Sequence, residues 1–226
     1  MTEIDFGENE LGDEGAKYIG DVLKVNTTLK SILLYHNEIG DAGVSYIAEA
    51  LKLNNTLNEI SFYGNHIGAD GAAQIAEALK VNTTLTMLDL NGNKIGNNGM
   101  KQFADMLKVN TTLTFLNMAY MFINDIRAKY IGEALSVNTT LTALTLFGND
   151  FGHEAIKYIA DMVKVNTKLN SIDFSSNSID DGGIKYIANA LKVNNTLTSI
   201  RLNNNEIGDS GVIHIAEALK VNTTLA

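Results

Sequence analysis

A few side chains in this sequence have the types that bind metal ions. His36 and His66 could form a pair of zinc ligands, but no third ligand accompanies them and the chain has no cysteine. Asp89, Asn91 and Asn93 alternate like the first ligands of a calcium loop, but the glutamate that closes such a loop is missing. We therefore expect no metal and no other cofactor, and we interpret the three alternating residues as part of the fold.

The patterns that enzymes use are also missing. The sequence has no thiol nucleophile, no glycine-rich phosphate loop and no Ser/His/Asp arrangement. We expect a non-catalytic protein. Asn-x-Thr sequons recur at Asn26, Asn54, Asn82, Asn110, Asn138, Asn194 and Asn222. We attribute them to a turn that follows each helix, and not to glycosylation.

The recurrence of these side chains has a simple origin, because the chain repeats one unit. Copies of 28 residues start at Met1, Leu29, Leu57, Leu85, Leu113, Leu141, Leu169 and Leu197. A fixed period of this length predicts a solenoid of stacked modules, in which each module packs only on its neighbours. We expect residues 1–226 to form a single domain of eight such repeats.

The first half of the unit predicts a strand. Ile32 and Leu34 alternate with more exposed positions, and this period of two is typical of a strand with one buried face. Asn37 closes the strand, and the asparagines at this point of the repeat should form a buried ladder that bonds loop backbone groups.

The second half of the unit predicts a helix. Ile47 and Leu51 belong to an apolar series at helical spacing. We predict a helix from about Asp41, a good N-cap residue, to Lys52. Asn54 follows, and we expect it to take the left-handed conformation that ends many helices. A helix between two strands makes those strands parallel.

The repeat carries a family pattern, L-x-x-L-x-L-x-x-N-x-I-G-x-x-G, over the whole chain. In the fourth copy it falls on Leu85, Leu88, Leu90, Asn93, Ile95 and Gly99. The pattern resembles the leucine-rich repeat family, in its ribonuclease-inhibitor-like subtype, which NOD-like receptors share. The resemblance implies a right-handed α/β horseshoe, with parallel strands on the concave side and helices on the convex side. It also implies protein recognition through the concave face, as in innate-immune receptors and bacterial effectors.

The charge is distributed unevenly. The net charge is −9, and most of the 17 basic residues fall in two helix columns, whereas the strands and loops are acidic. An acidic concave face would repel nucleic acid and attract a partner with basic and apolar contact residues. The acidity could also serve solubility alone. No segment is apolar enough to span a membrane, and the lack of cysteine suits the cytoplasm, or a host cytoplasm for an effector.

The fifth repeat departs from the pattern. Met121 replaces the strand-closing asparagine, and Asn124 and Arg127 replace two glycines. Met121 cannot make the bonds of an amide, so we expect the turn to change shape or to take up water. This repeat is either a specificity loop or a neutral lapse.

The candidate binding residues are apolar and aromatic side chains at outward strand positions and in the adjoining loops. They are Leu33, Tyr35, His36, Tyr63, Met87, Phe115, Tyr120, Phe122 and Phe147. We expect the rings of Tyr35 and Tyr63 to lie side by side, because neighbouring strands are about 4.8 Å apart. Contiguous exposed aromatics are typical of interaction surfaces, although scattered surface apolar residues are normal.

Two other functions remain open at this point. The repeat also resembles that of the Ran GTPase-activating protein, which implies a GTPase regulator, but no set of loop residues can be assigned to that activity. A structural spacer that assembles with itself, or an end-to-end homodimer, is the other alternative.

Overall fold

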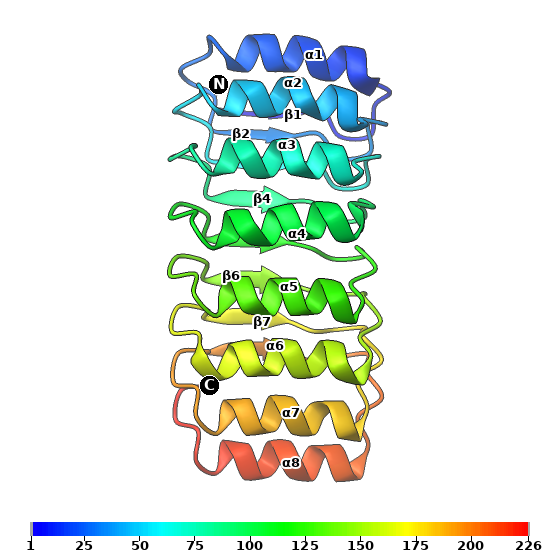
Figure 1. Ribbon diagram of the computed structural model, residues 1–226, viewed down its shortest axis with the longest axis vertical. Helices are drawn as coiled ribbons and strands as arrows, with labels where there is room; N and C mark the ends of the chain where they lie inside the picture. Colours follow the sequence, from blue (N-terminus) through cyan, green and yellow to red (C-terminus); the bar gives the residue numbers. More distant parts are fainter. Residues whose placement is uncertain (1, 226) are drawn as a thin grey trace.

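Parallel strands and helices alternate along the chain, and Figure 1 shows them as two layers, with the helices in front of the sheet. The computed structural model describes residues 2–225, so Met1 and Ala226, the ends of the predicted domain, lie outside the described residues. The strands are β1 Glu3–Asp5, β2 Ser31–Leu33, β3 Glu59–Ser61, β4 Met87–Asp89, β5 Phe115–Asn117, β6 Ala143–Thr145, β7 Ser171–Asp173 and β8 Ser199–Arg201. The helices are α1 Gly12–Leu23, α2 Asp41–Leu51, α3 Ala69–Leu79, α4 Gly96–Leu107, α5 Asp125–Leu135, α6 His153–Val165, α7 Asp181–Leu191 and α8 Asp209–Leu219.

The sheet follows the chain order from β1 to β8, and all its pairs are parallel. Each residue pairs with the residue one repeat later, as Ile4 does with Ile32 and Ile32 with Ile60. The predicted α/β solenoid is therefore confirmed. Because the register never slips, equivalent residues of successive repeats form straight columns on the sheet.

One hydrophobic core runs between the sheet and the helices. The middle residue of an inner strand, such as Ile60 or Leu88, is fully buried. In the outermost strands Ile4 and Ile200 are only partly buried, because a neighbouring repeat covers them on one side only.

The predicted asparagine ladder is present. The Asn65 amide donates to the carbonyl oxygens of Leu34 at 2.8 Å and Phe62 at 2.9 Å. Its oxygen accepts the backbone N–H groups of Asn37 at 3.1 Å and Ile39 at 3.0 Å. Asn65 therefore ties its turn to the turn before it and satisfies backbone groups that are buried away from water.

A second ladder follows the helices, and it corrects the prediction for Asn54. This residue does not adopt the left-handed conformation. Its amide donates to Leu23 O of the preceding repeat at 2.8 Å, and its oxygen accepts the N–H groups of Thr56 at 3.0 Å and Leu57 at 2.8 Å. The sequon asparagine is thus a buried turn residue, because its side-chain oxygen accepts the backbone N–H groups of the turn.

Helix capping differs from the prediction as well. The N-cap of α2 is Gly40, not Asp41. The Asp13 carboxylate of the preceding repeat accepts the N–H groups of Gly40 at 2.7 Å and Gly43 at 2.9 Å. Asp41 in turn accepts the N–H of Gly68 at the start of the next helix, at 2.6 Å. Stacking places the start of one helix beside the first turn of its neighbour, so this aspartate caps between repeats.

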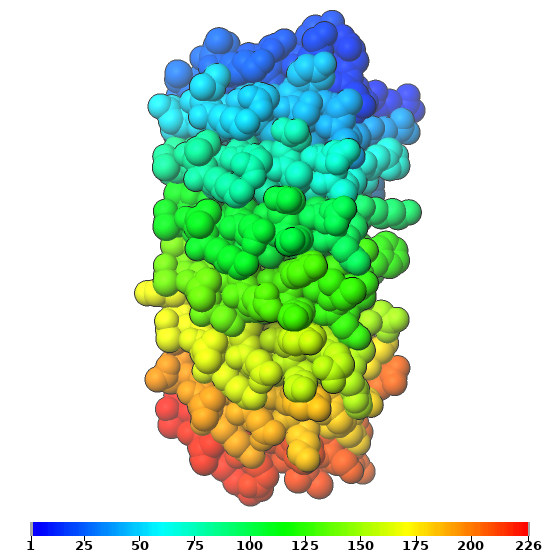
Figure 2. Space-filling view, in the orientation of Figure 1, coloured from blue at the N-terminus to red at the C-terminus, as the bar shows by residue number. Residues whose placement is uncertain are grey.

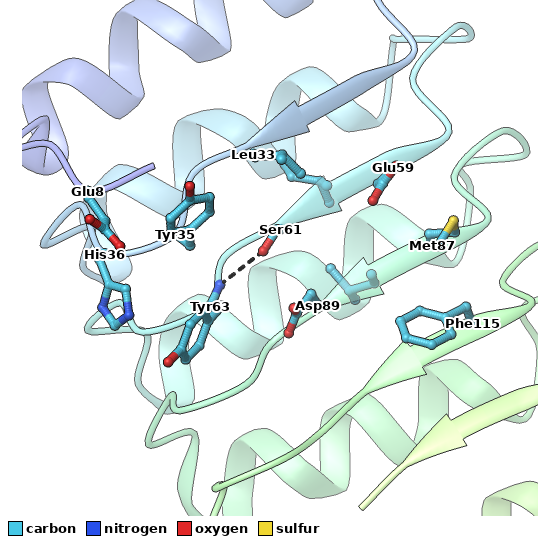
Figure 3. Close-up of a pocket in the computed structure, with 12 residues that line it drawn as sticks. Glu8, Leu33, Tyr35, His36, Glu59, Ser61, Tyr63, Met87, Asp89 and Phe115 are labelled. Atoms are coloured by element: carbon cyan, nitrogen blue, oxygen red, sulfur yellow. Dashed lines mark hydrogen bonds between the residues drawn. The ribbon is translucent and has the colours of Figure 1, made fainter. Parts of the chain in front are cut away.

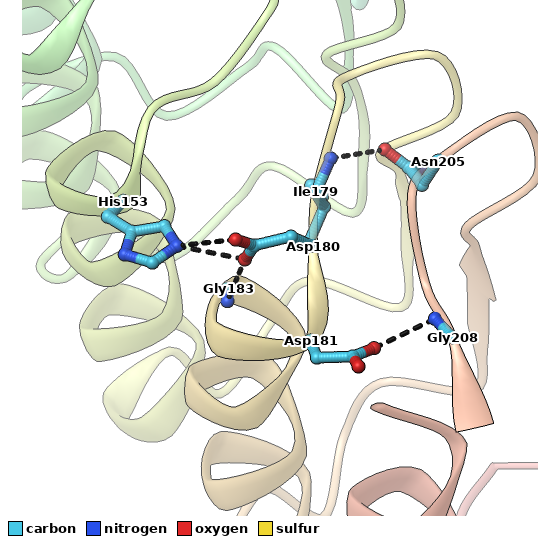
Figure 4. A network of polar contacts seen from close by, with 7 residues as sticks. All are labelled: His153, Ile179, Asp180, Asp181, Gly183, Asn205 and Gly208. Atoms are coloured by element: carbon cyan, nitrogen blue, oxygen red, sulfur yellow. Dashed lines mark hydrogen bonds and ion pairs between the residues drawn. The ribbon is translucent and has the colours of Figure 1, made fainter. Parts of the chain in front are cut away.

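The helix α7 is capped by its own N-cap residue and not by the preceding repeat (Figure 4). Its N-cap residue Asp180 accepts the N–H of Gly183 in its own first turn at 2.8 Å. In α6 the position of the capping aspartate is occupied by His153, whose Nε2 lies 2.8 Å from Asp180 Oδ1. The bond from Gly183 and the one from His153 lower the pKa of Asp180. The next helix returns to capping between repeats, because Asp181 accepts the N–H of Gly208 at 2.8 Å.

The outer side of the helices is a continuous surface on which the repeats lie as successive bands (Figure 2). Lysines on this side pair with acids one turn earlier, as Lys164 does with Asp161 at 2.6 Å and Lys108 with Asp105 at 2.8 Å. The predicted basic columns are thus largely compensated within their own helices. Among residues 2–225, no helix has the length and apolar character needed to cross a membrane.

Candidate functional site

The face of the sheet opposite the helices, here called the strand face, contains a hollow of about 430 Å³ over β2 to β5 (Figure 3). Six of the predicted binding residues line it, namely Leu33, Tyr35, His36, Tyr63, Met87 and Phe115. Its other lining residues are Glu8, Glu59, Ile60, Ser61, Leu88 and Asp89. The repeat brings these side chains together because all of them come from outward strand positions, from the strand cores beneath, or from the turns that follow.

The aromatic contacts differ from the predicted pairing of Tyr35 with Tyr63. The ring of His36 lies edge-on to Tyr63, with 4.5 Å between the ring centroids, and 6.2 Å from Tyr35. His36 has φ +50°, and its ring covers Gly64 of the next repeat. The left-handed backbone therefore directs the imidazole, and not Tyr35, toward the following strand.

Tyr35 leans the other way, toward the first repeat. Its ring lies against Gly7, where a Cβ atom would clash with it, and its hydroxyl donates to Asp5 Oδ2 at 3.3 Å. The nearby Asp5 carboxylate raises the pKa of Tyr35, so the phenol stays protonated and remains a donor. Tyr35 is therefore fixed at one wall of the hollow.

The opposite wall follows from the register of the sheet. Glu59 pairs with Met87, and Met87 pairs with Phe115, so these side chains form one column across β3, β4 and β5. Met87 is exposed and Phe115 is half-buried. The column offers apolar and aromatic contact area next to one carboxylate.

Asp89 lies in the hollow, in the next column of the sheet. Burial raises the pKa of this carboxyl, and the charge of Glu59 adds to the effect. The N–H of Asn91 donates to Asp89 at 2.9 Å, and this bond and the side chains of Asn117 and Ser61 act in the opposite direction. Asp89 takes part in no ion pair within residues 2–225.

The predicted site omitted Glu8, Glu59 and Asp89. Their outward orientation could have been found from the alternation of the strands, because Glu59 and Asp89 occupy the same face as Met87 and Phe115.

The other three predicted residues lie outside the hollow, Tyr120 and Phe122 in the turn after β5 and Phe147 after β6, and together they are here called the edge cluster. Tyr120 and Phe147 pack edge to face, with centroids 5.0 Å apart at 82°. Phe122 is 65% exposed. Tyr120 has φ +49° and Phe122 has φ +54°, a conformation that costs a bulky residue about 1–2 kcal/mol. The predicted binding residues thus form two groups, because Asn91 and Ala119 occupy the equivalent positions in the two repeats between Tyr63 and Phe147.

Arg127 holds the turn that carries the edge cluster. Its Nη1 donates to the carbonyl oxygens of Met121 at 3.1 Å and Phe122 at 2.7 Å, and its Nε donates to Asn97 Oδ1 at 2.8 Å. Asn124 caps α5 by accepting the N–H of Arg127 at 3.0 Å. The two residues that replace glycines therefore supply contacts that the consensus repeat does not have.

The turn that contains Met121 differs little from the other turns. It keeps the usual bonds, because the N–H groups of Met121 and Ile123 both donate to Asn149 Oδ1. In the turn before, no amide is present to accept from Asn93, whose N–H donates to Leu90 O at 3.3 Å. There α4 begins at Gly96 with φ +65°. Gly12 begins α1 in the same way although Asn37 follows in the next repeat, so this shape is not an effect of Met121. The expected change of shape is not observed at the turn of Met121, whose positive φ values at Tyr120 and Phe122 match those of His36 and Glu38.

The remaining sequence candidates have structural roles or stay apart. His36 packs on Tyr63. The Asn93 amide belongs to the ladder and donates to Phe62 O at 2.9 Å, as expected. Within the described part of the chain, no group of three or more histidine, aspartate or glutamate side chains could hold a metal ion.

Comparison with known proteins identifies the same repeat. A family model described as Leucine Rich repeat matches residues 1–20, 25–48, 81–104, 137–160, 165–188 and 193–216, together more than half of the chain. None of the curated proteins matches this chain. Of 184 matching chains of known structure, one is described as Leiomodin-1 Actin-Binding Site 2, with 31% identity, a TM-score of 0.48, and coverage of 51% of this chain and 69% of that chain. Another is the tropomodulin C-terminal domain of Caenorhabditis elegans, with 14% identity, a TM-score of 0.56, and coverage of 68% and 92%, which shows a shared fold.

Proposed function

The chain belongs to the leucine-rich repeat family, and we propose that it is a non-catalytic module that binds a protein partner through its strand face. The observation that carries the proposal is the hollow, where Tyr35, Tyr63 and Phe115 are grouped with three carboxylates. Solvent-facing strand positions have no structural need of aromatic rings, and grouped aromatics are typical of interface centres.

The contrast with the last repeats supports this choice of surface. At the corresponding positions β7 and β8 carry Ser171 and Ser199 where β5 carries Phe115. All three positions have the same relation to the core, so the fold tolerates serine there. Aromatic side chains at the middle of the sheet therefore serve contact with something outside the chain.

The edge cluster extends the proposed surface. Tyr120 and Phe122 are exposed and are held in a strained turn by Arg127. The left-handed backbone is shared by the equivalent residues of other repeats, such as Ser176 and Ser178, so the feature particular to this turn is its exposed rings. We propose that these rings contact the same partner at its margin, in a recognition role like those of effectors and innate-immune receptors. A cytoplasmic location is part of the proposal and is supported by the lack of cysteine.

The test changes the hollow and leaves the fold intact. The double variant Tyr63→Glu with Phe115→Glu should lose partners that the wild-type protein captures from its native host, since two charges would face the apolar contact. The matched control is Ser199→Glu with Asn203→Glu, which adds the same charge at the same strand positions in β8 and the turn after it.

Each captured partner is then purified and titrated by calorimetry against all three proteins. An affinity loss confined to the hollow variant supports the proposal. Equal binding by the hollow variant and the wild type, with both thermally stable, would show that the strand face is not the binding surface.

A further inference from the structure

The polar and aromatic groups of the hollow are arranged around a carboxylate, Asp89, that forms no ion pair with any of the residues 2–225. We propose that the hollow receives one cationic side chain, lysine or arginine, of the protein partner, with its charged end at Asp89 and its stem against the surrounding rings. The inference rests on the proposed function, because it assigns the chemistry of the group that the same surface binds.

Register places Asp89 at the centre of the arrangement. It pairs with Ser61 on β3 and with Asn117 on β5. Tyr63 comes two residues after Ser61 and Phe115 two residues before Asn117, so all of these side chains point to the strand face. The carboxylate therefore has an aromatic ring diagonally on each side, and Figure 3 shows both rings beside it.

The charges favour a cation. Glu8, Glu59 and Asp89 line the hollow, and no lysine or arginine does so. Asp89 is partly removed from water, which raises its pKa and makes its negative charge costly. A positive group at this point would remove that cost, whereas an apolar side chain would bury the carboxylate further without compensation.

The walls favour a side chain with an apolar stem. Aromatic faces attract a cation, and the attraction grows as water is removed from the contact. Leu33 and Met87 offer aliphatic contact beside the rings. A volume of about 430 Å³ is at the low end of the range for ligand sites, roughly 300–1,000 Å³, and suits one long side chain rather than a helix.

The experiment uses small probes, so that it does not depend on finding the partner. Nα-acetyl-lysine N-methylamide and Nα-acetyl-arginine N-methylamide are titrated into the full chain, and the ring resonances of Tyr63 and Phe115 are followed by NMR. The norleucine counterpart, which has a similar stem and no charge, is the neutral probe.

At least one cationic probe should shift both rings in a saturable way, and the norleucine probe should bind about tenfold more weakly or not at all. The preferred cation distinguishes lysine from arginine, since guanidinium stacks on rings more readily. Asp89→Asn should weaken cation binding about tenfold or more. Asp173→Asn is the matched control, because Asp173 accepts the N–H of Ser175 at 2.8 Å just as Asp89 accepts that of Asn91.

Equal binding of the cationic and neutral probes would overturn the inference, and so would unchanged binding by Asp89→Asn. Tyr63→Leu is a second variant, which removes the ring and keeps an apolar side chain, and it should also weaken cation binding. The partner assay separates the two proposals. If Asp89→Asn still binds the partner while the double variant of Tyr63 and Phe115 does not, the strand face is the binding surface but Asp89 does not bind a cationic side chain. If both variants keep the partner, the proposed function itself fails.

Discussion

The carboxylate of Asp41 accepts the backbone N–H of Gly68 at 2.6 Å, so the first turn of one helix caps the start of the next. Asp13, Asp125 and Asp181 make the same kind of bond to the repeats that follow them. In this array the cap of a helix is therefore an interaction between repeats, and a single aspartate stabilises both a helix and an interface.

Removal of this cap should cost stability. Asp41→Ala leaves the Gly68 N–H without its acceptor, and the expected loss is about 1 kcal/mol, or a fall of roughly 2–4 °C in the thermal midpoint. Asp70→Ala is the control, because Asp70 also lies in the first turn of its helix but is exposed. Circular dichroism melts of both variants test the prediction, which fails if the two midpoints fall equally.

The two capping modes should be interchangeable only as a pair. His153→Asp alone places a second carboxylate beside Asp180, and Asp180→Gly alone removes the N-cap of α7. Together they recreate the arrangement of Asp181 and Gly208. We expect a favourable coupling of about 0.5–3 kcal/mol in a double-mutant cycle measured by urea unfolding. Additive effects would contradict the proposed equivalence.

Arg127 should be important for its hydrogen bonds and not for its charge alone. Arg127→Met keeps the length of the side chain but leaves Met121 O and Phe122 O without their donor, and we expect a loss of about 1 kcal/mol. Arg127→Lys should recover only part of it, because an ammonium lacks the guanidinium fork. Arg201→Met, at an exposed and distant ion pair, should change stability by less than about 0.5 kcal/mol. Urea denaturation checks the order, and full recovery by lysine would disprove it.

Phe122 should be unfavourable for the fold. Its φ of +54° suits glycine, so Phe122→Gly should raise the thermal midpoint. The gain in the free energy of unfolding should be less than about 1 kcal/mol after the entropy cost of glycine. Phe115→Gly, in a strand, should lower it. Calorimetric melts of the two variants measure these opposite shifts of the thermal midpoint. A loss of stability in Phe122→Gly would show that the ring serves packing and not contact.

Asp89 should make stability depend on pH. Because burial raises its pKa in the folded state, ionisation costs more there than in the unfolded chain, and stability is lost as the pH rises through the folded pKa. Asp89→Asn should therefore be more stable than wild type at neutral pH, with a gain that disappears in acid. The charge of Glu59 on β3 adds to the raised pKa of Asp89, so the comparison is repeated with Glu59→Gln in both proteins.

Asp180→Asn should change the pH dependence of stability in the opposite direction. The folded pKa of Asp180 is lowered, so its carboxylate contributes stability above the usual aspartate range, and that contribution is lost as the pH falls through the folded value. This variant should be less stable than wild type at neutral pH. Melting curves at a series of pH values would contradict the assignment if the two substitutions shifted the midpoint in the same direction.

Much of the fold follows from local pattern in the sequence. The strand ending at Leu33, the helix from Asp41 to Leu51 and the ladder through Asn65 were all predictable, because alternation, helical spacing and a fixed period report which side of the chain is buried. The period also gives the register, since identical units stack without a slip. The same pattern placed the aromatic residues on one face of the sheet.

The tertiary structure alone decided what those residues contact. His36 reaches Tyr63 because its backbone is left-handed, and Asp41 caps the helix of the next repeat. Arg127 makes hydrogen bonds to its own turn for which a glycine has no side chain. Asp89 became part of the site only when its burial and its neighbours were known. Sequence spacing specifies which residues share a face, but direction, reach and solvation depend on the turn backbone and on neighbouring repeats, and these exist only after the units have stacked.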